Sequence, residues 1–447
     1  MQQKIIQHQE QAHKQIHRDE RHGKPRRVAV IGLGYVGLPL VLLSEEAGYQ
    51  VMGVDSDTAK VEALKQRIAP YLSAKEQVRF RKSKLSLLSD TSYLKNADII
   101  LMCVPTPVYD NHEPNLEPVK EASRLIAANL RAGQLIIIES TVNPGVCEEV
   151  ILPILKSRSG LSAGSDYFFA HCPERINPGD EKWTISNIPR VVGAADPRSL
   201  RYAASFYRSI LDGDVHPMRS LKEAEAVKVV ENSFRDINIA FVNELAMSFD
   251  RLRIDLLNVI RGASTKPFSF LPHYPGCGVG GHCIPVDPYY LITYAAQNGF
   301  THRFMSLARE INNKMPHYTV DLLAAALKRI HRPLSGARIA LLGLSYKKDV
   351  PDLRESPALA IKEELLRRGA IVRAYDPLVP EHSTEKNLER TIAGTHGAII
   401  ATDHTAFEKL QPELFLREGV TIIIDGKNCL SKETFLAAGI DYKGIGR

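Results

Sequence analysis

The chain has 447 residues, which predicts two or three domains at about 150 residues per domain. Its content of 44% hydrophobic and 24% charged residues is typical of a folded protein rather than a disordered one. The net charge is +6, of which +4 belongs to residues 1–27 and only +2 to the other 420 residues. A nearly neutral body gives no sign of the basic surface of a nucleic-acid-binding protein, so we expect no nucleic-acid partner.

No stretch of the sequence predicts a membrane span. The longest apolar stretch, residues 28–43, has 16 residues and is interrupted by glycines and a proline, whereas a spanning helix needs roughly 20 apolar residues. The N-terminus lacks the apolar core of an export signal, which predicts a cytoplasmic protein with no membrane partner. Six cysteines do not suggest a disulfide framework, so we expect reduced thiols that are available as a nucleophile or as metal ligands.

Residues 1–26 are rich in glutamine, histidine and charged side chains, and we predict that they form a disordered tail. Four histidines of this tail are candidate metal ligands: His8, His13, His17 and His22. Their spacing drifts around a helix, so a solvated segment is the simpler interpretation. We expect no metal site in the protein.

Residues 27–217 alternate between short apolar strands and helices. We predict strands at residues 28–32, 50–55, 97–104, 134–139, 167–170 and 190–193, and helices after the first strand and over residues 117–130 and 144–156. Strands that alternate with helices imply right-handed crossovers and a doubly wound parallel sheet.

Residues 218–330 are predicted to be mostly helical. Ser220-Leu-Lys-Glu223 matches a capping box, which opens a helix to about Asp250 whose apolar residues recur every three or four positions. A long helix between two α/β regions offers a dimer surface, so we expect a homodimer or a larger homo-oligomer.

Residues 331–447 return to strand–helix alternation. Strands are predicted at residues 338–344, 370–375, 397–402 and 420–425. The predicted fold class is therefore α/β, with two Rossmann-like doubly wound domains, residues 27–217 and 331–447, joined by the helical segment 218–330.

Gly32, Gly34 and Gly37 form a GxGxxG pattern between the first strand and its helix. The first glycine permits the tight turn, the second lets the backbone approach a pyrophosphate, and the third lets helix and strand pack closely. Asp55 lies 23 residues after Gly32, at the end of the second strand, where it can accept hydrogen bonds from a ribose and so favours NAD over NADP. A purely structural glycine turn is the alternative.

A glycine-rich loop spans residues 275–288. Four of its glycines fall within six positions, which argues against a helix because each costs about 1 kcal/mol in a helix interior: Gly276, Gly278, Gly280 and Gly281. At the end of the loop, Cys283 is predicted to be a thiol nucleophile beside a substrate, with Asp287 four residues further on. The alternatives are a metal site formed by Cys277, His282 and Cys283, or a glycine-rich loop with an inert cysteine.

Three other places carry candidate polar groups. Lys228 and Asn232 share one face of the long helix and could stabilise an oxyanion near a reacting thiol, although a solvated helix face is the alternative. Glu174 follows a strand, at the sheet edge where ligands usually bind, or it is an ordinary surface residue. Thr141 also follows a strand and is either a helix cap or a cofactor contact.

The loop of residues 343–357 follows a strand and precedes a helix in the last region. It contains Lys347, Lys348 and Arg354 beside the helix N-terminus. This combination suits an anionic group such as a diphosphate, and a charged loop without a ligand is the alternative.

From about Arg27 to the C-terminus, these motifs resemble the UDP-glucose/GDP-mannose dehydrogenase family and occur in the family's order. The matching motifs are Gly32–Gly37, Val104–Pro107, Glu139–Thr141, Pro173-Glu174, Lys228 with Asn232, Gly280–Cys283, Tyr346-Lys347 and Arg354–Pro357. Residues 263–268 and 283–291 most resemble the UDP-N-acetylhexosamine 6-dehydrogenases. This branch implies UDP-N-acetylglucosamine as the favoured substrate or UDP-N-acetylmannosamine, and a UDP-glucose 6-dehydrogenase is the alternative.

The resemblance implies a four-electron oxidation of the sugar C6 hydroxyl to a carboxylate, with two NAD consumed per sugar. Cys283 would form a thiohemiacetal and then a thioester, which water activated by Glu174, with Asp287 assisting, would hydrolyse. Lys228 and Asn232 would stabilise the oxyanions, and Thr141 would order the waters. The cofactor contacts implied beyond the glycines and Asp55 are Tyr35, Val36, Thr106 and Thr141. The substrate contacts implied are Glu174, Arg175, Lys228, Asn232, Tyr274, Gly276, Gly280, Lys347 and Arg354.

Two departures from the family pattern stand out. Pro178 occupies a position where relatives often have a glutamate, and residues 67–72 replace a segment that often contains glycine. Two other functions stay open: a two-electron β-hydroxyacid dehydrogenase, which needs no cysteine nucleophile, and a non-enzymatic dinucleotide-sensing module whose partner binds the central helix.

Overall fold

The structure is a computed structural model that describes residues 26–109, 113–176 and 182–447. The predicted tail, apart from Arg26, and the departure at Pro178 lie outside the described residues. The chain divides into two compact units, one formed by the residues up to Glu231 with Tyr289–Tyr294, the other by Asn232–Pro288 with Ala295–Arg447. We describe each unit by itself.

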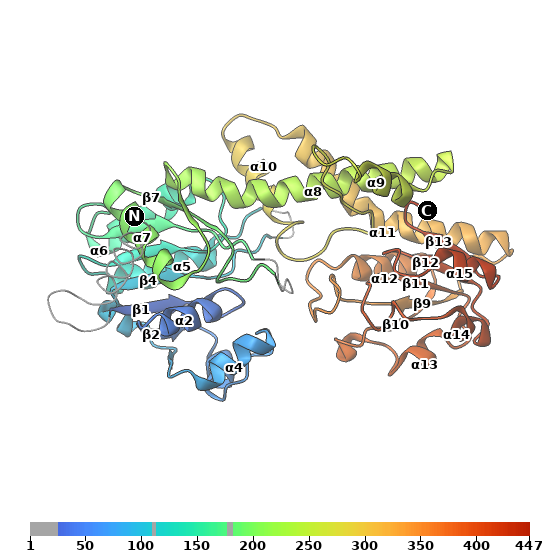
Figure 1. The fold of residues 1–447 in the computed structure, drawn as a ribbon, viewed down its shortest axis with the longest axis horizontal. Helices are drawn as coiled ribbons and strands as arrows, with labels where there is room; N and C mark the ends of the chain where they lie inside the picture. Colours follow the sequence, from blue (N-terminus) through green and yellow to red (C-terminus); the bar gives the residue numbers. More distant parts are fainter. Residues whose placement is uncertain (1–25, 110–112, 177–181) are drawn as a thin grey trace. The chain divides into compact units, whose positions relative to one another are not determined.

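The first unit contains an eight-stranded sheet with the order β3-β2-β1-β4-β5-β6-β7-β8, drawn in blue to green in Figure 1. Its strands are β1 (Arg27–Ile31), β2 (Gln50–Val54), β3 (Ser86–Leu88), β4 (Ile99–Met102), β5 (Leu135–Ile138), β6 (Phe168–His171), β7 (Arg190–Ala194) and β8 (Val215–Pro217). The six predicted strands are confirmed, with shifted ends. The prediction missed β3 and β8, because a strand of three residues is too short to show a period.

Helices cover both faces of this sheet. They are α2 (Gly37–Glu46), α3 (Thr58–Lys65), α4 (Ala74–Lys82), η1 (Ser92–Asn96), α5 (Glu117–Asn129), η2 (Cys147–Ile151), α6 (Leu152–Ser159) and α7 (Pro197–Ile210). Alternate residues of β1 enter separate cores: Val28 and Val30 pack with α2 and α7, whereas Ala29 and Ile31 pack with α5 and α6. This alternation is what a doubly wound sheet requires.

Two local predictions for this unit differ in part from the structure. The helix predicted over residues 144–156 is confirmed with shifted ends, but it begins with the π-helical turn η2 and continues as α6 to Ser159. Pro153 has no N–H to donate to the fourth preceding carbonyl, which favours the wider turn before it. The sheet is also not wholly parallel, because β7 runs antiparallel to β6. The described part of the connection between these strands contains no crossover helix, which a parallel pair would need.

The central region is helical, as predicted, and the described residues 218–330 contain no strand. Its helices are α8 (Leu221–Leu252), α9 (Leu256–Ala263), α10 (Asp287–Gln297) and α11 (Arg303–Arg329). At the start of α8, the Ser220 hydroxyl accepts a hydrogen bond from the N–H of Glu223 (3.1 Å). The Glu223 carboxylate, however, accepts from the N–H of Arg219 (2.9 Å) rather than from Ser220, so the capping box is shifted by one residue.

In the part of the chain that the structure describes, no helix combines the length and the apolar content needed to cross a membrane.

The second unit contains a wholly parallel sheet with the order β10-β9-β11-β12-β13, drawn in orange to red in Figure 1. Its strands are β9 (Arg338–Leu342), β10 (Ile371–Tyr375), β11 (Gly397–Ile400), β12 (Ile422–Asp425) and β13 (Asp441–Gly444). Its helices are α12 (Pro357–Arg367), η3 (Pro380–His382), α13 (Leu388–Ile392), α14 (Pro412–Arg417) and α15 (Lys432–Ala437). Here β13 was missed because its sequence, DYKG, has almost no apolar residues. The predicted α/β class with two doubly wound sheets is confirmed.

Both sheets have a topological switch point, where the strand order reverses. It lies between β1 and β4 in the first sheet and between β9 and β11 in the second. Ligands of doubly wound proteins bind beyond the carboxyl ends of such strand pairs. The Gly32–Gly37 turn and the loop of residues 343–357 both begin at a switch point.

Candidate active site

In the glycine turn after β1, packing requires two of the three glycines, whereas the third fits a ligand-binding role. Gly32 has a left-handed backbone (φ 90°), and a Cβ there would lie 2.6 Å from the Cys103 carbonyl oxygen. A Cβ on Gly37 would lie only 1.8 Å from the Gly32 carbonyl oxygen. A Cβ on Gly34 would meet nothing within 4 Å, so packing does not require glycine at this position. An open backbone at the start of α2 fits the approach of a pyrophosphate.

Asp55, at the end of β2, holds this turn in place. Its buried carboxylate accepts hydrogen bonds from the N–H of Leu33 (2.8 Å), the N–H of Asp57 (3.0 Å) and the ammonium of Lys60 (3.0 Å). The oxygen facing Asp57 accepts one hydrogen bond and can accept another, so a ribose hydroxyl is still compatible with Asp55. Sequence reasoning missed Lys60, whose ammonium also donates to the Asp55 carboxylate.

Residues 67–72, which differ from the usual family sequence, also contribute contacts to the glycine turn after β1. The hydroxyl of Tyr71 donates to the Leu33 carbonyl (2.5 Å), and its ring packs on Tyr35 with 5.2 Å between the centroids. Burial raises the pKa of Tyr71 far above its ordinary value, so the hydroxyl stays protonated as a donor. Of two further predicted cofactor contacts, Tyr35 is exposed, whereas Val36 is partly buried and packs against the core of the first sheet.

The loops after β4 and β5 bring together the next predicted contacts. The Ser140 hydroxyl donates to the Val104 carbonyl (2.7 Å), and the hydroxyl of Tyr290 on α10 donates to the Thr106 carbonyl. Thr141 is half-buried beside them in the chain and does not cap a helix, since η2 begins only after Val146. The helix-cap alternative for Thr141 is therefore wrong.

The face of α8 that carries Lys228 is buried, so a solvated helix face is excluded for this part of the helix. Lys228 is only 8% exposed, and Glu225, one turn earlier, is fully buried. The Glu225 carboxylate accepts hydrogen bonds from the N–H groups of Gly145 (2.6 Å) and Cys147 (2.8 Å). It thereby ties α8 to the loop that follows Thr141, a role that sequence reasoning missed because the partners are about 80 residues apart.

Glu174 is held by a buried guanidinium. Arg190, at the start of β7, lies 2.6 Å from the Glu174 carboxylate on one side and 3.2 Å from that of Glu139 on the other. The other Glu174 oxygen accepts from the N–H groups of Arg175 (2.5 Å) and Ile176 (2.6 Å). This arrangement shows that Glu174 is not an ordinary surface residue. Sequence reasoning missed Arg190, although a charged residue at the start of an apolar strand is a signal that could have pointed to it.

The second carboxyl group of this cluster, that of Glu139, has a raised pKa. Burial, together with the nearby Glu174, raises the pKa of Glu139 to about 7, although the charge of Arg190 opposes this shift. The hydroxyl of Tyr207 also donates to Glu139. Because one guanidinium cannot fully neutralise two buried carboxylates, a proton retained on Glu139 leaves the ion pair between Arg190 and Glu174 intact.

The side chain of Arg175, a predicted substrate contact, is engaged within the first unit. Its guanidinium pairs with Glu231 on α8 and donates to the Pro189 carbonyl (2.9 Å). It therefore braces the segment that follows Glu174 against α8.

In the second unit, three of the predicted catalytic residues lie together. The amide of Asn232 donates to the buried carboxylate of Asp287 (2.5 Å). The Cys283 carbonyl accepts from the N–H groups of Val286 (3.1 Å) and Asp287 (2.8 Å), so the cysteine stands one turn before α10. Its sulfur lies 3.5 Å from Nε2 of His282.

The other cysteines are poor nucleophiles. Burial is the largest cause of a raised pKa at five thiols: Cys103, Cys147, Cys172, Cys277 and Cys429. Cys277 is fully buried, and its thiol faces the Ala401 carbonyl (3.4 Å) in the core under the second sheet. Its burial argues against a metal set of Cys277, His282 and Cys283. Among the described residues, no group of three or more histidine, cysteine or acidic side chains could hold a metal ion.

The glycines before Cys283 let their loop pack directly on the loop after β9. The N–H of Gly281 donates to the Arg354 carbonyl (3.0 Å), and a Cβ on Gly280 would lie 2.6 Å from Cβ of Tyr346. The N–H of Gly276 donates to Asn243 on α8 (2.9 Å). Tyr274, just before this loop, is exposed. The glycine loop is therefore packed within the second unit, whereas the reactivity of Cys283 stays a prediction.

The cations of the loop after β9 are partly committed to acids. The guanidinium of Arg354 is bound by both oxygens of Asp352, and Lys348 pairs with Glu408 (2.5 Å). Burial raises the pKa of Asp352, but the hydrogen bonds from Arg354 outweigh it and hold that pKa below its usual range. Lys347 is half-buried in the same loop.

The sequence-predicted residues thus fall into two groups. The first unit contains Gly32, Gly34, Tyr35, Val36, Gly37, Asp55, Thr106, Thr141, Glu174, Arg175 and Lys228. The second unit contains Asn232, Tyr274, Gly276, Gly280, Cys283, Asp287, Lys347 and Arg354. The first group lies in the loops after β1, β2, β4, β5 and β6, at the start of α2 and on α8. The second group lies on α8, in the segment between α9 and α10, at the start of α10 and in the loop after β9.

Models of known protein families match the regions of the chain that contain both groups of residues. In the UDP-glucose/GDP-mannose dehydrogenase family, the model of the NAD binding domain matches residues 26–211, that of the central domain residues 222–314, and that of the UDP binding domain residues 340–432. The chain belongs to this family. It is therefore an NAD-dependent nucleotide-sugar dehydrogenase, which confirms the resemblance recognised in its motifs.

Relatives within the dehydrogenase family match almost end to end. UDP-N-acetyl-D-glucosamine 6-dehydrogenase from Pseudomonas aeruginosa is 38% identical over 400 residues, which cover 87% of this chain and 93% of the relative. UDP-N-acetyl-D-mannosamine dehydrogenase from Pyrococcus horikoshii is 34% identical over 426 residues, covering 94% and 99%. A solved structure of UDP-D-ManNAc dehydrogenase from Pyrococcus horikoshii has a TM-score of 0.89 at 34% identity, covering 94% of this chain and 99% of that one.

Alanine at Gly37 and at Gly34 separates packing from cofactor binding. The Cβ at position 37 meets backbone, so we expect Gly37→Ala to lower the melting temperature by several degrees, at a cost of ~2 kcal/mol or more. Gly34→Ala has room for its Cβ, so it should melt like the wild type but bind NAD about tenfold more weakly. Thermal unfolding and NAD titration measure the two effects. Equal losses of stability would contradict this interpretation.

Glu139→Gln tests the raised pKa of the buried carboxyl. The folded state holds this proton more tightly than the unfolded chain, so its contribution to stability is complete below about pH 4.5 and is lost as the pH rises through about 7. The glutamine cannot titrate, so the variant should gain stability relative to the wild type between about pH 5 and pH 8, on the order of 3 kcal/mol.

Urea unfolding at several pH values measures this difference. Glu148→Gln, at an exposed position nearby, serves as the control and should show no trend. A difference between Glu139→Gln and wild type that stays constant with pH would show that Glu139 is ionised in the folded protein.

Proposed function

We propose that the protein oxidises the C6 hydroxyl of a UDP-N-acetylhexosamine to a carboxylate in a four-electron reaction that consumes two NAD per sugar. The observation that carries the proposal is the cluster of Cys283, Asp287 and Asn232 at the end of a glycine loop that packs on the loop after β9. The similarity to dehydrogenases of both UDP-N-acetylglucosamine and UDP-N-acetylmannosamine supports the sugar class. We take UDP-N-acetylglucosamine as the first candidate.

The glycine turn and Asp55 would hold NAD, whose nicotinamide accepts one hydride in each of the two oxidations. Its pyrophosphate would meet the open backbone at Gly34 and the N-terminus of α2. Thr106 and Thr141 belong to the loops after β4 and β5, at the same edge of the sheet, where they would contact the cofactor.

Cys283 is the proposed nucleophile. Its thiolate would add to the C6 aldehyde, which forms a carbon–sulfur bond and an oxyanion. Asn232 and Lys228 would stabilise this oxyanion as hydrogen-bond donors. Loss of the second hydride from the thiohemiacetal leaves a thioester.

Hydrolysis of the thioester needs a base. Glu174 would take a proton from water, which attacks the thioester carbon, breaks the carbon–sulfur bond and releases the uronate and the thiol. The buried ion pair with Arg190 and the two backbone N–H groups hold this carboxylate in one orientation. Asp287 would assist by orienting Asn232.

The UDP group would bind to the loop after β9, through Lys347 and Arg354. The bidentate contact with Asp352 holds the guanidinium of Arg354 against its own loop, which limits the entropy lost when a diphosphate binds. Tyr274, Gly276 and Gly280 belong to the neighbouring glycine loop and would contact the sugar end.

We also propose a cytoplasmic homodimer formed through α8. On this helix Val230, Phe234 and Phe241 are each more than half exposed, and their spacing places them on one stripe. None of the six cysteines, all of them described, forms a disulfide, which is typical of a reducing compartment.

Replacement of Cys283 tests the chemistry directly. We expect the wild type to produce two NADH per sugar consumed and Cys283→Ala to produce no uronate, because no thioester can form. Cys429→Ala removes another partly buried thiol and should retain full turnover. NADH absorbance and product mass spectrometry measure both quantities. One NADH per sugar would instead favour the two-electron dehydrogenase, and undiminished turnover of Cys283→Ala would exclude the nucleophile.

A panel of UDP-sugars tests the substrate. We expect kcat/KM to be higher for the N-acetylated sugars (UDP-N-acetylglucosamine, UDP-N-acetylmannosamine and UDP-N-acetylgalactosamine) than for UDP-glucose. Initial rates of NADH formation give the comparison, and mass spectrometry identifies the uronates. A preference for UDP-glucose would overturn the proposed sugar class and leave the family assignment unchanged.

A further inference from the structure

The loop between β9 and α12 adopts a backbone that needs external support. Asp349 (φ 54°) and Glu355 (φ 49°) both have left-handed conformations, which are unfavourable for residues that carry a Cβ. The loop also contains Lys347 and Arg354, the two residues proposed to bind UDP. Whatever holds Asp349 in this conformation therefore helps to shape the proposed diphosphate site.

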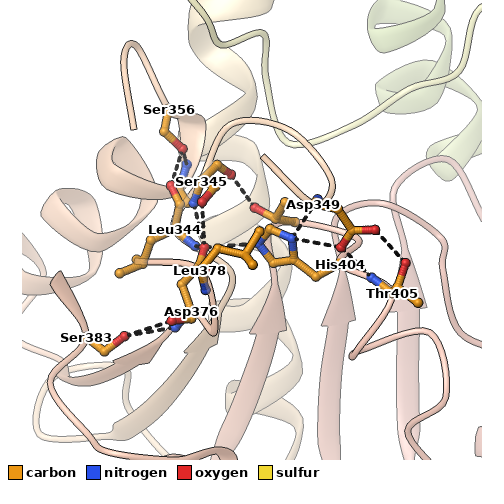
Figure 2. A network of polar contacts seen from close by, with 11 residues as sticks. Leu344, Ser345, Asp349, Ser356, Asp376, Leu378, Ser383, His404 and Thr405 are labelled. Carbon is orange, nitrogen blue, oxygen red and sulfur yellow. Dashed lines mark hydrogen bonds and ion pairs between the residues drawn. The ribbon is translucent and has the colours of Figure 1, made fainter. Parts of the chain in front are cut away.

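The beginning of the loop is held by Asp376, at the end of β10 (Figure 2). One oxygen of this fully buried carboxylate accepts from the N–H of Leu344 (2.8 Å), from the N–H and hydroxyl of Ser345 (2.8 and 2.9 Å) and from Nε2 of His404 (3.0 Å). Burial raises the pKa of Asp376, but these hydrogen bonds outweigh it and hold that pKa well below its usual range. The acceptor is therefore a carboxylate.

His404 connects this carboxylate to the middle of the loop. Its ring is 1% exposed, with Nε2 facing Asp376 and Nδ1 2.9 Å from the N–H of Asp349, as Figure 2 shows. A backbone N–H can only donate, so Nδ1 must accept and the ring proton must lie on Nε2. The ring is therefore neutral, and both of its nitrogens are used.

The carboxylate of Asp349 closes the connection. It accepts from the N–H (3.0 Å) and the hydroxyl (2.5 Å) of Thr405, the residue after His404. The segment that follows β11 thus grips Asp349 by its backbone through His404 and by its side chain through Thr405.

The first sheet shows what this arrangement adds. There Asp55 also binds the N–H of the residue after the turn glycine, but its other partners are Asp57 and Lys60, both close in sequence. In the second sheet, His404 extends the same kind of anchor to a residue five positions beyond Leu344. The additional element serves the longer loop rather than the turn itself.

We propose that His404 is a positioning residue for UDP-sugar binding: its neutral ring, hydrogen-bonded to Asp376 and to the Asp349 N–H, holds the loop after β9 in the conformation that binds the diphosphate. This inference rests on the proposed function of that loop. His404 contacts no part of the proposed substrate and acts through Asp349.

Two substitutions separate the two ring nitrogens. His404→Asn retains an acceptor near the position of Nδ1, whereas His404→Gln retains a donor near Nε2 and loses that acceptor. We expect His404→Gln to weaken UDP binding about tenfold or more, with an equal rise in the KM for the UDP-sugar and little change in kcat. His404→Asn should recover much of this loss. Calorimetric titration of the full-length protein with UDP, and separately with NAD, measures the affinities.

His396→Gln is the matched control. Nδ1 of His396 also accepts from a backbone N–H, that of Arg338 (2.9 Å), but at the start of β9 rather than beyond its end. This variant should bind UDP like the wild type. Thr405→Val, which removes one hydrogen bond to Asp349, provides a milder change if His404→Gln does not fold, and it should weaken UDP binding about threefold.

Three results would overturn the inference. The first is unchanged UDP affinity in His404→Gln or, if that variant does not fold, in Thr405→Val. The second is equal weakening of UDP and NAD binding in the variant used, and the third is an equal loss of UDP affinity in His396→Gln. A wild-type protein that does not bind UDP would instead refute the proposed function of the loop, which keeps the two failures distinct.

Discussion

In both sheets, a carboxylate at the end of the second strand binds the backbone of the turn that follows the first strand. Asp55 accepts from Leu33, and Asp376 accepts from Leu344, each at 2.8 Å. The preceding glycines, Gly32 and Gly343, both have left-handed backbones, and the neighbouring strand end also leaves no room for a Cβ at either position. This interaction directs each turn toward the switch point of its sheet, where the ligand loops begin.

The two anchors differ in how much capacity they leave for a ligand. The oxygen of Asp55 that faces Asp57 accepts only one hydrogen bond, so it can accept another from a ligand. One oxygen of Asp376 accepts four donors, and the carboxylate is fully buried. Under the proposed function, the acid at the end of the second strand would therefore contact a nucleotide directly in one domain and would act only through its loop in the other.

Buried charge defines the remainder of the candidate site. Arg190 is fully buried between Glu139 and Glu174, and removing the Glu174 carboxylate would leave an uncompensated charge in the core. This cost, together with the two backbone N–H groups, fixes the orientation of the Glu174 carboxylate within the folded domain. The buried Glu225 connects α8 to the loop after β5 in a comparable way.

Much of the fold was predictable because its signals are local. The six long strands of the first domain, the helix from Ser220 and the GxGxxG turn all follow from periodicity, capping and glycine spacing. The short strands β3 and β8 and the polar strand β13 carry no such signal. The antiparallel direction of β7 follows from the connection before it, which lacks a crossover helix in its described part. The π-helical turn η2 follows from the accommodation of Pro153.

The sequence by itself determined the two α/β domains, the helical segment between them and the candidate residues of the glycine turn, the cysteine loop and the loop after β9. Glycine content, apolar periodicity and motif order act over a few residues and can be read without a fold. Only the tertiary structure decided the partners of the charged groups: Arg190 with Glu139 and Glu174, Glu225 with Gly145, and His404 with Asp376 and Asp349. Most of these partners lie between 28 and 80 residues apart, and strand order, which no local pattern encodes, brings them into hydrogen-bond distance.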